Sequence, residues 1–570
     1  MAAGMGRIPR RPIAPDLSRV FFVDNFLLSY EITAGRKRMT DINKVPVLIV
    51  GGGPVGLAMA SALGRFGVRS LVVERSPTTT DHPKSRGCNT RTMEIFRQWG
   101  VEAAVRAHGM TGRTDVWVMM ERMAGPEYGR TRSEPRSEET PARKCLVAQD
   151  GVEAALLCAV RDTGIATARF ATELVDFEDR GTHVRARIRD LRADTIETWE
   201  ADWLVAADGA GSGTRHAAGI EMIGPPSLAV LINDYLRVDL SRFAVSKQAA
   251  LIRIIPPDRA IPSVTVLNTN GIDRWLMVMG VGDERQRPVP DSEVGTFLQP
   301  YIGVDDLDVR RISTSTWRMS KQVAATFRKG RVLLAGDSAH RFPPTGGFGL
   351  NSGVQDAHNL AWKLAYVLNG QASVRLIDSY DQERRPVAQS NADWSFGNMR
   401  RLPHVEEACR SGNRERIDFW FNDLDNHMHS TGQALGFAYE QGAVISDGST
   451  PAAHDPRHYT PTDRPGSRFP HFWLDDAHTT SSLDWFDRDF VLVAGRDAGD
   501  WLEAGRAVSD QLGLPIALKQ LPVQGVDPGC RLGRRGAALV RPDGHVAWRM
   551  PWMPTDPRAA LAGAFATLLH

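Results

Sequence analysis

The segment from Val45 to Glu74 constrains the fold more than any other part of this sequence. It contains a short apolar run rich in β-branched residues (VPVLIV), a stretch with helical spacing (AMASALGRFG) and a second apolar run (SLVVE). This order predicts a strand, a helix and a second strand. The turn after the first strand has the spacing G-x-G-x-x-G, with Gly51, Gly53 and Gly56. In such a turn the first glycine permits a tight bend, the second lets the backbone approach a pyrophosphate, and the third allows close helix packing.

An acidic residue, Glu74, ends the second predicted strand eighteen residues after Gly56. A carboxylate at this position can accept a hydrogen bond from a ribose hydroxyl, and the start of the helix favours an anion. The motif therefore predicts a dinucleotide site, with a glycine-rich structural turn as the alternative. The uncharged run from Val45 to Gly64 has the length of a membrane span, but its glycines and Pro54 would interrupt a spanning helix.

The composition excludes several other classes of protein. The chain has 570 residues, which predicts two to four domains at roughly 150 residues each. Its 69 basic and 67 acidic residues leave a net charge of +2, which gives no electrostatic case for nucleic acid or for a polybasic membrane anchor. The five cysteines are scattered and include no C-x-x-C pair, so the sequence predicts neither a disulfide framework nor a metal site. The expected compartment is the cytoplasm.

The middle of the chain alternates between helical and strand-like patterns. Helices are expected at about 90–108 and at 351–368, and the polar segment at about 125–143 is expected to be a loop. Residues 166–205 predict a meander that ends in the buried strand WLVAA, and residues 227–318 predict a mainly antiparallel sheet. The run RVLLAGD then resumes the character of a parallel sheet.

The last hundred residues predict a small α/β domain. They contain the strand-like segments FVLVAG, PIALKQLPV and AALVRPDGHVAWR, and a helical stretch closes the chain. Within the third segment, Pro542, Asp543 and Gly544 predict a hairpin turn.

Two further motifs follow apolar runs. Asp208 and Gly209 follow WLVAA, and Gly336 and Asp337 follow RVLLA and lead into HRFPPTGGFGLNSGVQDAHNLAWKLA. Together with the glycine turn, these motifs make residues 45–400 resemble the FAD-dependent aromatic hydroxylases, the class A flavoprotein monooxygenases of the p-hydroxybenzoate and phenol hydroxylase type. The last hundred residues resemble the thioredoxin-like extension attached to many of these enzymes.

The resemblance implies an α/β fold with three domains. These are a Rossmann-like FAD-binding domain, a substrate domain built on an antiparallel sheet, and a C-terminal thioredoxin-like α/β domain. The expected boundaries are 1–38 for a poorly ordered N-terminal extension, 39–226 and 329–400 for the two parts of the FAD-binding domain, 227–328 for the substrate domain, 401–464 for a helical connection and linker, and 465–570 for the thioredoxin-like domain.

The resemblance also implies roles for residues that match the family's motifs. The residues expected to bind FAD, without a covalent bond, are Gly51, Gly53, Gly56, Glu74, Arg75, Arg86, Gln149, Asp208, Gly209, Gly336, Asp337, Gly349, Leu350 and Asn351. Within this set, Asp208 and Gly209 belong to a motif implied to contact both FAD and NAD(P)H, and Asp337 is implied to bind the ribityl hydroxyls. The backbone amides of Leu350 and Asn351 are implied to face the flavin pyrimidine oxygen, and a helix start there suits the negative charge that develops on reduction.

Two residues are candidates for a part in the reaction. The carbonyl of Pro344 is expected to face the substrate beside the flavin. His340 lies near the predicted flavin site and is a candidate catalytic residue, although the family places this histidine structurally. Phenol hydroxylases with an aspartate base carry it roughly where this chain has Arg86, so the base that activates the substrate is not identified.

Other polar residues are given structural interpretations. His358, Trp362 and Lys363 on the long helix are expected to be packing or solvated residues, and the cluster at 383–385 is expected to be an ion-paired clamp between helices. Cys530 stands apart from the other cysteines, so thiol redox chemistry is not expected of the C-terminal domain. The pocket is expected to be lined by polar residues of the substrate domain and by those near Trp317, Met319 and Ser320.

The predicted function is the hydroxylation of a phenolic substrate by an FAD monooxygenase. NADPH or NADH would reduce the flavin, O2 would form a C4a-hydroperoxide, and its distal oxygen would pass to the ring, because the cofactor carries this chemistry. The alternatives are a Baeyer–Villiger oxygenation, a flavin oxidase or dehydrogenase, a halogenase, which the missing W-x-W-x-I-P segment disfavours, and a non-catalytic FAD-binding protein. The expected partners are a small aromatic molecule and O2, with neither nucleic acid nor a membrane, and a homodimer is left open.

Overall fold

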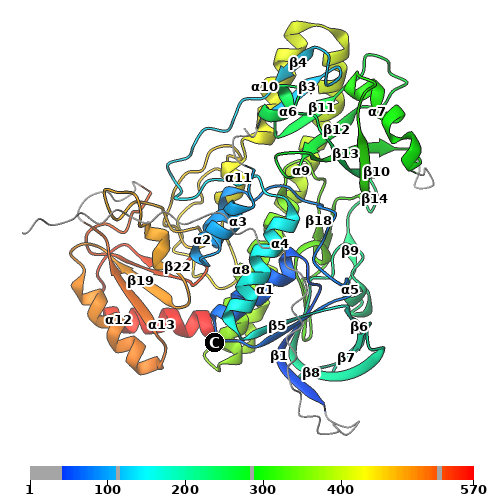
Figure 1. Cartoon of the computed structure of the whole chain (residues 1–570). Coiled ribbons are helices and arrows are strands. Elements are labelled where there is room, and N and C mark those ends of the chain that lie inside the picture. The colour runs from blue at the N-terminus through cyan, green and yellow to red at the C-terminus, as the bar shows by residue number, and fades with distance from the viewer. Residues whose placement is uncertain (1–41, 111–115, 283–287, 523–528) are drawn as a thin grey trace, which may run out of the picture. The chain divides into compact units, whose positions relative to one another are not determined.

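The computed structural model describes residues 42–110, 116–282, 288–522 and 529–570 (Figure 1). The extension expected at residues 1–38 lies outside the described residues. All the helices and strands below belong to the unit formed by Ile42–His570.

The predicted strand, helix and second strand are present at the beginning of this unit. β1 (Asn43–Val50) pairs in parallel with β2 (Ser70–Glu74), and α1 (Pro54–Arg65) connects the two strands. On its other side β1 pairs in parallel with β8 (Thr195–Ala206). The residues from Val47 to Ile49 are fully buried, which is expected of a parallel strand covered on both faces.

These strands are part of an eight-stranded sheet. Its path runs β16-β17-β8-β1-β2-β5, and β7 pairs with β8 and with β6. The remaining strands are β5 (Ala166–Phe170), β6 (Thr172–Asp179), β7 (Val184–Asp190), β16 (Arg328–Lys329) and β17 (Val332–Leu334). Because β17, β8, β1 and β2 are parallel, their carboxyl ends meet at one edge of the sheet, where ligands bind in open α/β sheets.

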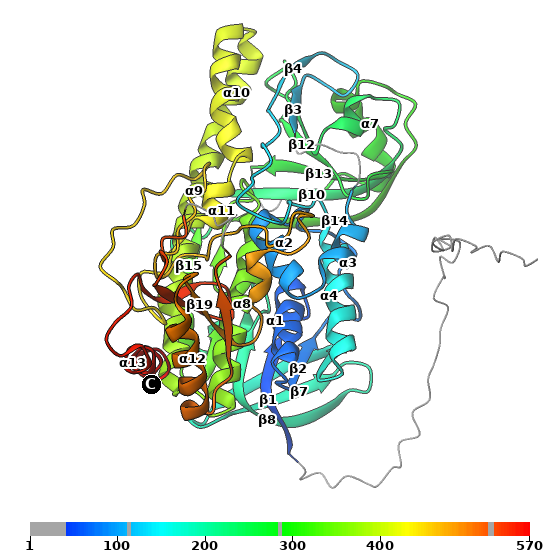
Figure 2. The same ribbon diagram turned by 90° about the vertical axis from the view of Figure 1, so that its left-hand side faces the viewer.

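Three helices pack next to one another on this sheet. α1 lies between α4 (Gln149–Thr163) and α8 (Phe348–Leu368), as Figure 2 shows. Nearly every residue of α8 is buried, because neighbouring elements cover it on several sides. The long helix predicted at residues 351–368 is therefore present and starts slightly earlier.

The single helix expected at residues 90–108 is two helices. α2 (Thr90–Gln98) and α3 (Glu102–Ala107) are separated by a short turn. Gly100 in this turn has a φ of +74°, a left-handed conformation that commonly ends a helix. The segment is therefore helical, as predicted, but it forms two helices instead of one.

A seven-stranded sheet forms a second layer beyond the carboxyl ends of the parallel strands. Its order is β14-β10-β13-β12-β11-β3-β4, and most of its neighbouring strands are antiparallel. Its strands are β3 (Trp117–Met120), β4 (Glu127–Arg130), β10 (Ala229–Val238), β11 (Leu251–Ile254), β12 (Val264–Asn268), β13 (Arg274–Val281) and β14 (Val309–Met319).

The structure corrects the prediction for the polar segment at residues 125–143. Part of this segment is strand β4, which pairs with β3, and β3 in turn pairs in parallel with β11. The charged sequence of β4 is typical of a sheet edge, where side chains face solvent, and that is why it read as a loop. The second sheet therefore takes two of its strands from within the segment 39–226 that was assigned to the FAD-binding domain.

A third sheet has three strands, in the order β18-β15-β9. Its strands are β9 (Met222–Ile223), β15 (Gln322–Ala324) and β18 (His340–Arg341).

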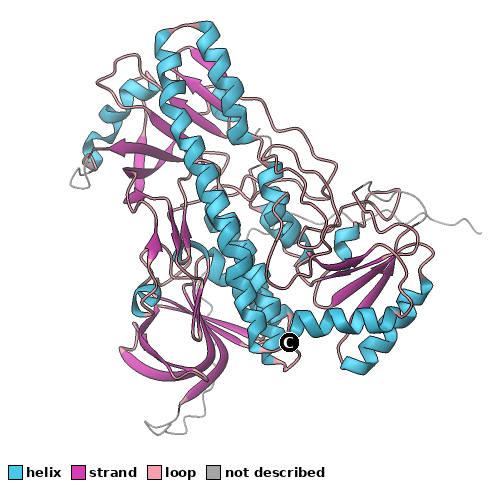
Figure 3. Cartoon of the chain, turned by 180° about the vertical axis from the view of Figure 1, so that it is seen from behind, coloured by secondary structure: helices cyan, strands magenta, loops and turns pink. Residues whose placement is uncertain are grey.

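The long helix α9 (Asp378–Ser411) extends from the first sheet to the second, where α10 (Arg414–Met428) folds back along it (Figure 3). α9 is continuous across residue 400, at which the sequence suggested a domain boundary. The shorter helices are α5 (Gly213–Ala217), α6 (Val245–Gln248), α7 (Val294–Ile302) and α11 (Thr431–Leu435).

The C-terminal region forms the predicted small α/β domain. Its four-stranded sheet has the order β20-β19-β21-β22. The elements are β19 (Phe490–Ala494), α12 (Gly499–Leu512), β20 (Ile516–Gln520), β21 (Ala537–Val540), β22 (Val546–Met550) and α13 (Pro557–Leu569). The predicted hairpin turn joins β21 to β22, and Gly544 has the positive φ of +77° that such a turn favours.

Within the described part of the chain, no helix combines the length and the apolar character that crossing a membrane requires.

Candidate active site

A cavity of about 2030 Å³ lies between the carboxyl ends of the parallel strands and the seven-stranded sheet. It is lined by the glycine turn after β1, by the ends of β2 and β8, by the start of α8, and by β10 to β14. A pocket for one small ligand usually measures about 300–1,000 Å³. This cavity therefore has room for a large cofactor together with a second molecule.

The glycine turn is held by close backbone contacts. Gly51 has a φ of +107°, and a Cβ on it would lie 2.2 Å from the carbonyl oxygen of Ala207. A Cβ on Gly56 would lie 1.9 Å from the carbonyl oxygen of Gly51, so α1 can approach β1 only with glycine at this position. Nothing lies within 4 Å of a Cβ on Gly53, which lines the cavity. The second glycine therefore leaves the helix start open to a ligand.

The acidic and basic residues around this turn line the same part of the cavity. Glu74 accepts hydrogen bonds from the backbone N–H groups of Gly52 (2.7 Å) and Ser76 (2.8 Å), so it also fixes the turn. Gln149 lines the cavity as well, and its amide donates to Glu153 (2.7 Å). Arg75 and Arg86, from the chain that follows β2, complete this group.

The second predicted motif lies at the end of β8. Asp208 and Gly209 both line the cavity, and the Asp208 carboxylate accepts hydrogen bonds from the backbone N–H (3.1 Å) and the hydroxyl (2.9 Å) of Thr214. Asp208 thus holds the start of α5. Gly209 has a φ of +78° and open space at its Cβ position, so backbone approaches the cavity directly here.

The start of α8 presents polar groups to the cavity. Asp337 exposes its side chain to the cavity, and burial within the surrounding protein raises the pKa of its carboxyl. Gly347, the residue before α8, has a φ of +68° and caps the helix without a side chain. Gly349, Leu350 and Asn351 then line the cavity at the first turn of the helix. Free N–H groups at such a helix start favour a negative charge.

The Asn351 side chain also fixes the loop that carries Arg86. Its Oδ1 accepts a hydrogen bond from the N–H of Asn89 (2.8 Å), and its Nδ2 donates to the carbonyls of Gly87 (3.1 Å) and Gly347 (2.6 Å).

Two of the predicted cofactor residues do not line the cavity. Gly56 and Gly336 are buried behind it, where they let neighbouring elements pack closely.

Comparison with known proteins places this geometry in a family. Residues 44–395 match the family described as FAD binding domain, and residues 462–569 match the one described as aromatic-ring hydroxylase, C-terminal. The chain belongs to the FAD-dependent aromatic-ring hydroxylases. Its relatives include 4-methyl-5-nitrocatechol 5-monooxygenase of a Burkholderia species, with 34% identity over 92% of this chain and 98% of that protein. They also include tetracenomycin A2 monooxygenase-dioxygenase of Streptomyces glaucescens, with 33% identity over 92% and 97%.

A solved structure shows the same fold along nearly the whole hydroxylase. The crystal structure of the flavin-dependent monooxygenase PieE in complex with FAD and substrate has a TM-score of 0.86 and 32% identity, and the match covers 92% of this chain and 99% of that one. The fold class predicted from the sequence is confirmed, and the hydroxylase is a flavoprotein enzyme. The residues in the cavity fit FAD. The glycine turn leaves backbone open where a pyrophosphate needs it, and the Asp337 carboxylate, which faces the cavity, can accept hydrogen bonds from hydroxyl groups.

The fit predicts that Asp337→Ala weakens FAD binding. A hydrogen bond to a charged group contributes about 1.5–3 kcal/mol, so the dissociation constant of FAD is expected to rise roughly 10- to 100-fold. The apoprotein would be titrated with FAD while the quenching of flavin fluorescence is followed. Asp202→Ala, which removes an exposed carboxylate of β8 outside the cavity, is the matched control. Equal affinities in the two variants would contradict a role for Asp337 in holding FAD.

The two candidates for a part in the reaction have different positions. Pro344 lines the cavity, and its carbonyl accepts a hydrogen bond from the N–H of Gly347 (3.1 Å), so one of its lone pairs closes the turn before α8. His340 does not line the cavity. It is fully buried, its Nε2 lies 2.7 Å from the Asp356 carboxylate, and its ring stacks on Phe342. The catalytic prediction for His340 is not supported, because an imidazole enclosed in this way cannot contact a substrate.

The far wall of the hydroxylase cavity is built by the seven-stranded sheet. The expected residues Trp317, Met319 and Ser320 line it. The indole N–H of Trp317 donates to the side-chain oxygen of Asn233 (2.9 Å), which ties β14 to β10 at the cavity surface. Arg253 on β11 also faces the cavity and is paired with Glu406 of α9.

Several lining residues could not be inferred from the sequence. They are Trp117 and Met119 of β3, Met399 and Leu402 of α9, and Thr431 and Ala434 of α11. The apolar run WVMM was the signal for β3, but nothing in it shows that the strand joins a sheet formed mainly by residues beyond 227. The residues of α9 reach the cavity because that helix packs against β3 and the end of β11, and α11 packs against α2.

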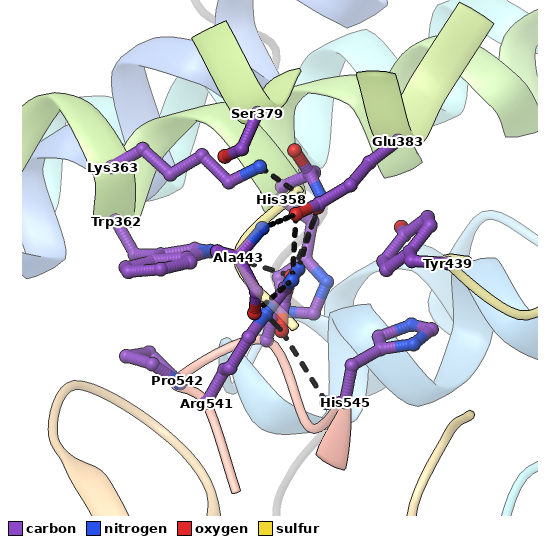
Figure 4. Close-up of polar contacts among 12 residues, drawn as sticks. His358, Trp362, Lys363, Ser379, Glu383, Tyr439, Ala443, Arg541, Pro542 and His545 are labelled. Carbon is purple, nitrogen blue, oxygen red and sulfur yellow. Dashed lines mark hydrogen bonds and ion pairs between the residues drawn. The ribbon is translucent and has the colours of Figure 1, made fainter. Parts of the chain in front are cut away.

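A buried ionic cluster joins α8 and α9 to the C-terminal hairpin (Figure 4). The Glu383 carboxylate accepts hydrogen bonds from both terminal nitrogens of Arg541 (2.8 and 2.9 Å), from Lys363 Nζ (2.8 Å) and from the N–H of Ala443 (2.8 Å). Arg541 is also paired with Asp543 in the hairpin turn. The side chains of Lys363, Glu383 and Arg541 are fully buried.

The cluster refines the interpretation of two helices. The ion-paired clamp predicted at residues 383–385 is present for Glu383, which pairs with Lys363 of α8, and for Arg384, which pairs with Asp356 of α8. Arg385 instead pairs with Asp381 within α9. Lys363 was expected to be a packing or solvated residue, but it is a buried and ion-paired lysine. Burial lowers the pKa of its amine to about 8. Burial would raise the pKa of Glu383, but the charges of Arg541 and Lys363 outweigh it and bring that pKa down to about 2.

The remaining reactive groups do not suggest other chemistry. None of the five cysteines, all within the described residues, forms a disulfide bond. Burial raises the pKa of Cys88 and of Cys145, so neither is a ready thiolate. Among the described residues, no group of three or more His, Cys, Asp and Glu side chains is arranged to hold a metal ion.

Proposed function

We propose that this hydroxylase uses NAD(P)H and O2 to add one oxygen atom to a phenolic ring. The observation that carries the proposal is the continuity of the cavity, which joins the glycine turn and the start of α8 to the wall formed by β10 to β14. A cofactor at one end and an aromatic molecule at the other would therefore share one cavity. One relative is named for a methylnitrocatechol, which is a phenol.

When bound, FAD would supply the redox chemistry, which is the uptake of electrons from NAD(P)H and the transfer of one oxygen atom of O2 to the ring. The residues of the chain hold and shield the reactants. The N–H groups at Leu350 and Asn351 would favour negative charge on the flavin pyrimidine, since they stand at a helix start. Trp317 and the apolar residues of the second sheet would hold the substrate and keep water away from the reacting centre.

The test begins with a visible spectrum of the purified protein. NADH and NADPH oxidation would then be followed in air with phenols that range from 4-methylcatechol to 1,2-dihydroxyanthraquinone, and the products would be weighed by mass spectrometry. We expect a flavin spectrum, faster oxidation in the presence of one or more phenols, and a product heavier by one oxygen atom. The same mixture without O2 is the control.

The other outcomes separate the alternatives. Hydrogen peroxide without an oxygenated product would indicate an oxidase. A lactone or ester formed from a ketone substrate would indicate a Baeyer–Villiger reaction. Failure to bind flavin after reconstitution would contradict the proposed function.

A further inference from the structure

Strand β14, at one wall of the cavity, carries a short row of side chains on one face, two of which are serines. Ser313, Ser315 and Trp317 alternate along β14 and point to the same face of the sheet. Ser315 and Trp317 line the cavity, and Ser315 lies opposite Asn233 of β10. The hydroxyl of Ser315 is therefore available to a polar group of a molecule bound against this wall.

His82 lies behind this row, in the loop that connects β2 to α2. Its Nδ1 is 2.7 Å from the hydroxyl oxygen of Ser313, and its Nε2 is 3.1 Å from the hydroxyl oxygen of Ser315. The imidazole packs against the ring of Tyr235 in a T-shaped arrangement, with the ring centroids 5.9 Å apart. Both ring nitrogens are thus oriented by β14, while the side chain remains partly exposed.

Two carboxylates that contact the strands of this wall are held by cations. Glu406 is paired with Arg253, and Asp234 of β10 is paired with Arg311 of β14 (2.9 Å). A carboxylate in such a pair is stabilised in its charged form and is a weak base. His82 is the neutral base in contact with a hydroxyl that lines this wall.

We propose that Ser315 and His82 form the proton acceptor for a phenolic hydroxyl of the substrate, which is an inference that rests on the proposed function. Ser315 contacts the substrate, and His82 is a positioning residue that acts through it. The substrate O–H bond breaks and its proton forms a new bond to Ser315 Oγ, while the Ser315 proton moves to Nε2 of His82. The result is a phenolate and an imidazolium, so charge is conserved.

The surroundings of His82 suit this role. The Ser313 hydroxyl can accept a hydrogen bond from Nδ1–H, and in that tautomer Nε2 accepts from the Ser315 hydroxyl. Burial and the charge of Lys84 lower the pKa of His82, against the opposing charges of Asp81 on the same loop and Asp234 on β10. The imidazole is therefore neutral near pH 7 and able to take up a proton, which its partly exposed side chain can pass to solvent.

The test uses 1,2-dihydroxyanthraquinone as a probe with the FAD-loaded enzyme, because its visible spectrum reports both binding and ionisation. We expect bound probe to ionise at lower pH than free probe in the wild type. His82→Gln and Ser315→Ala are expected to raise this midpoint by about one pH unit or more, a tenfold change in the ionisation constant. His183→Gln, which changes another partly exposed histidine directly before β7 of the eight-stranded sheet, is expected to keep the wild-type midpoint.

A pH profile of product formation gives the second readout. His82→Gln is expected to lower kcat roughly 10²-fold at pH 6.5, within the range for general-base catalysis. Activity should recover as the pH rises, because the substrate then ionises without help, whereas a purely structural defect would not recover. Wild-type midpoints in both His82→Gln and Ser315→Ala, with intact flavin spectra, would overturn the relay. If the probe does not bind the wild type at all, the aromatic pocket of the proposed function fails, and the relay fails with it.

Discussion

Gly56→Ala is expected to yield a protein that is purified without flavin and is less stable than the wild type. The added Cβ would lie 1.9 Å from the carbonyl oxygen of Gly51, which is far inside van der Waals contact. Both groups belong to the backbone around the turn between β1 and α1, so neither can move without displacing the turn. Overpacking in a core typically costs about 1–3 kcal/mol, and this contact is closer than most.

A second helical glycine provides the control for Gly56→Ala. Gly295 lies in α7, and nothing lies within 4 Å of a Cβ built on it. Alanine is preferred to glycine inside a helix by about 1 kcal/mol, so Gly295→Ala should keep flavin and unfold at the same or a slightly higher temperature. The flavin absorbance after gel filtration and the thermal midpoint measure both variants. A flavin-replete Gly56→Ala protein of normal stability would show that the turn can adjust.

The features that the sequence predicted well are local ones. The glycine turn and Glu74 lie within one strand–helix–strand unit, so spacing and periodicity were enough to place them at the cavity. The motif around Asp337 and the start of α8 was found for a similar reason, since it directly follows a strand. In both cases the chain brings the residues together within about thirty positions.

The features that the sequence did not predict depend on contacts between distant segments. His82 reads as an ordinary loop residue, and only its contact with β14, more than two hundred positions later, makes it a candidate base. Lys363 was missed for the same reason, because a lysine on a helix is usually solvated. Its buried partner, Glu383, comes from α9 and is shared with Arg541 of the C-terminal hairpin. His340 was misplaced for the opposite reason. Its sequence neighbours line the cavity, but a buried bond to Asp356 turns its ring away.

Glu383→Gln is expected to destabilise the hydroxylase strongly. The substitution keeps the shape of the side chain but removes the negative charge that compensates Lys363 and Arg541 in a fully buried site. Breaking a buried ion pair by removing one partner costs about 3–5 kcal/mol, because the remaining charge is left without compensation. Urea unfolding at pH 7 measures the loss. Glu503→Gln on α12 removes an exposed carboxylate and is the matched control.

The same carboxylate predicts how stability depends on pH. The pKa of Glu383 is lowered to about 2 in the folded protein, whereas it is near 4.3 in an unfolded chain. A depressed carboxyl pKa contributes stability that is fully present above the unfolded value and is lost as the pH falls through the folded value. The wild type should therefore lose stability between about pH 4.5 and 2, and the difference between wild type and Glu383→Gln should narrow over that range.

A double variant tests whether charge compensation, rather than shape, accounts for the loss. Lys363→Met removes one of the two cations that Glu383 compensates, so Glu383→Gln combined with Lys363→Met should recover part of the stability that Glu383→Gln alone loses. If the two substitutions simply add, Lys363 and Glu383 do not interact energetically in the folded protein. Recovery would show that the charges are coupled. In that case Glu383 anchors the hairpin at Arg541 to α8 and α9, and α8 begins at the cavity. Limited proteolysis of Glu383→Gln should then release the C-terminal domain sooner than proteolysis of the wild type.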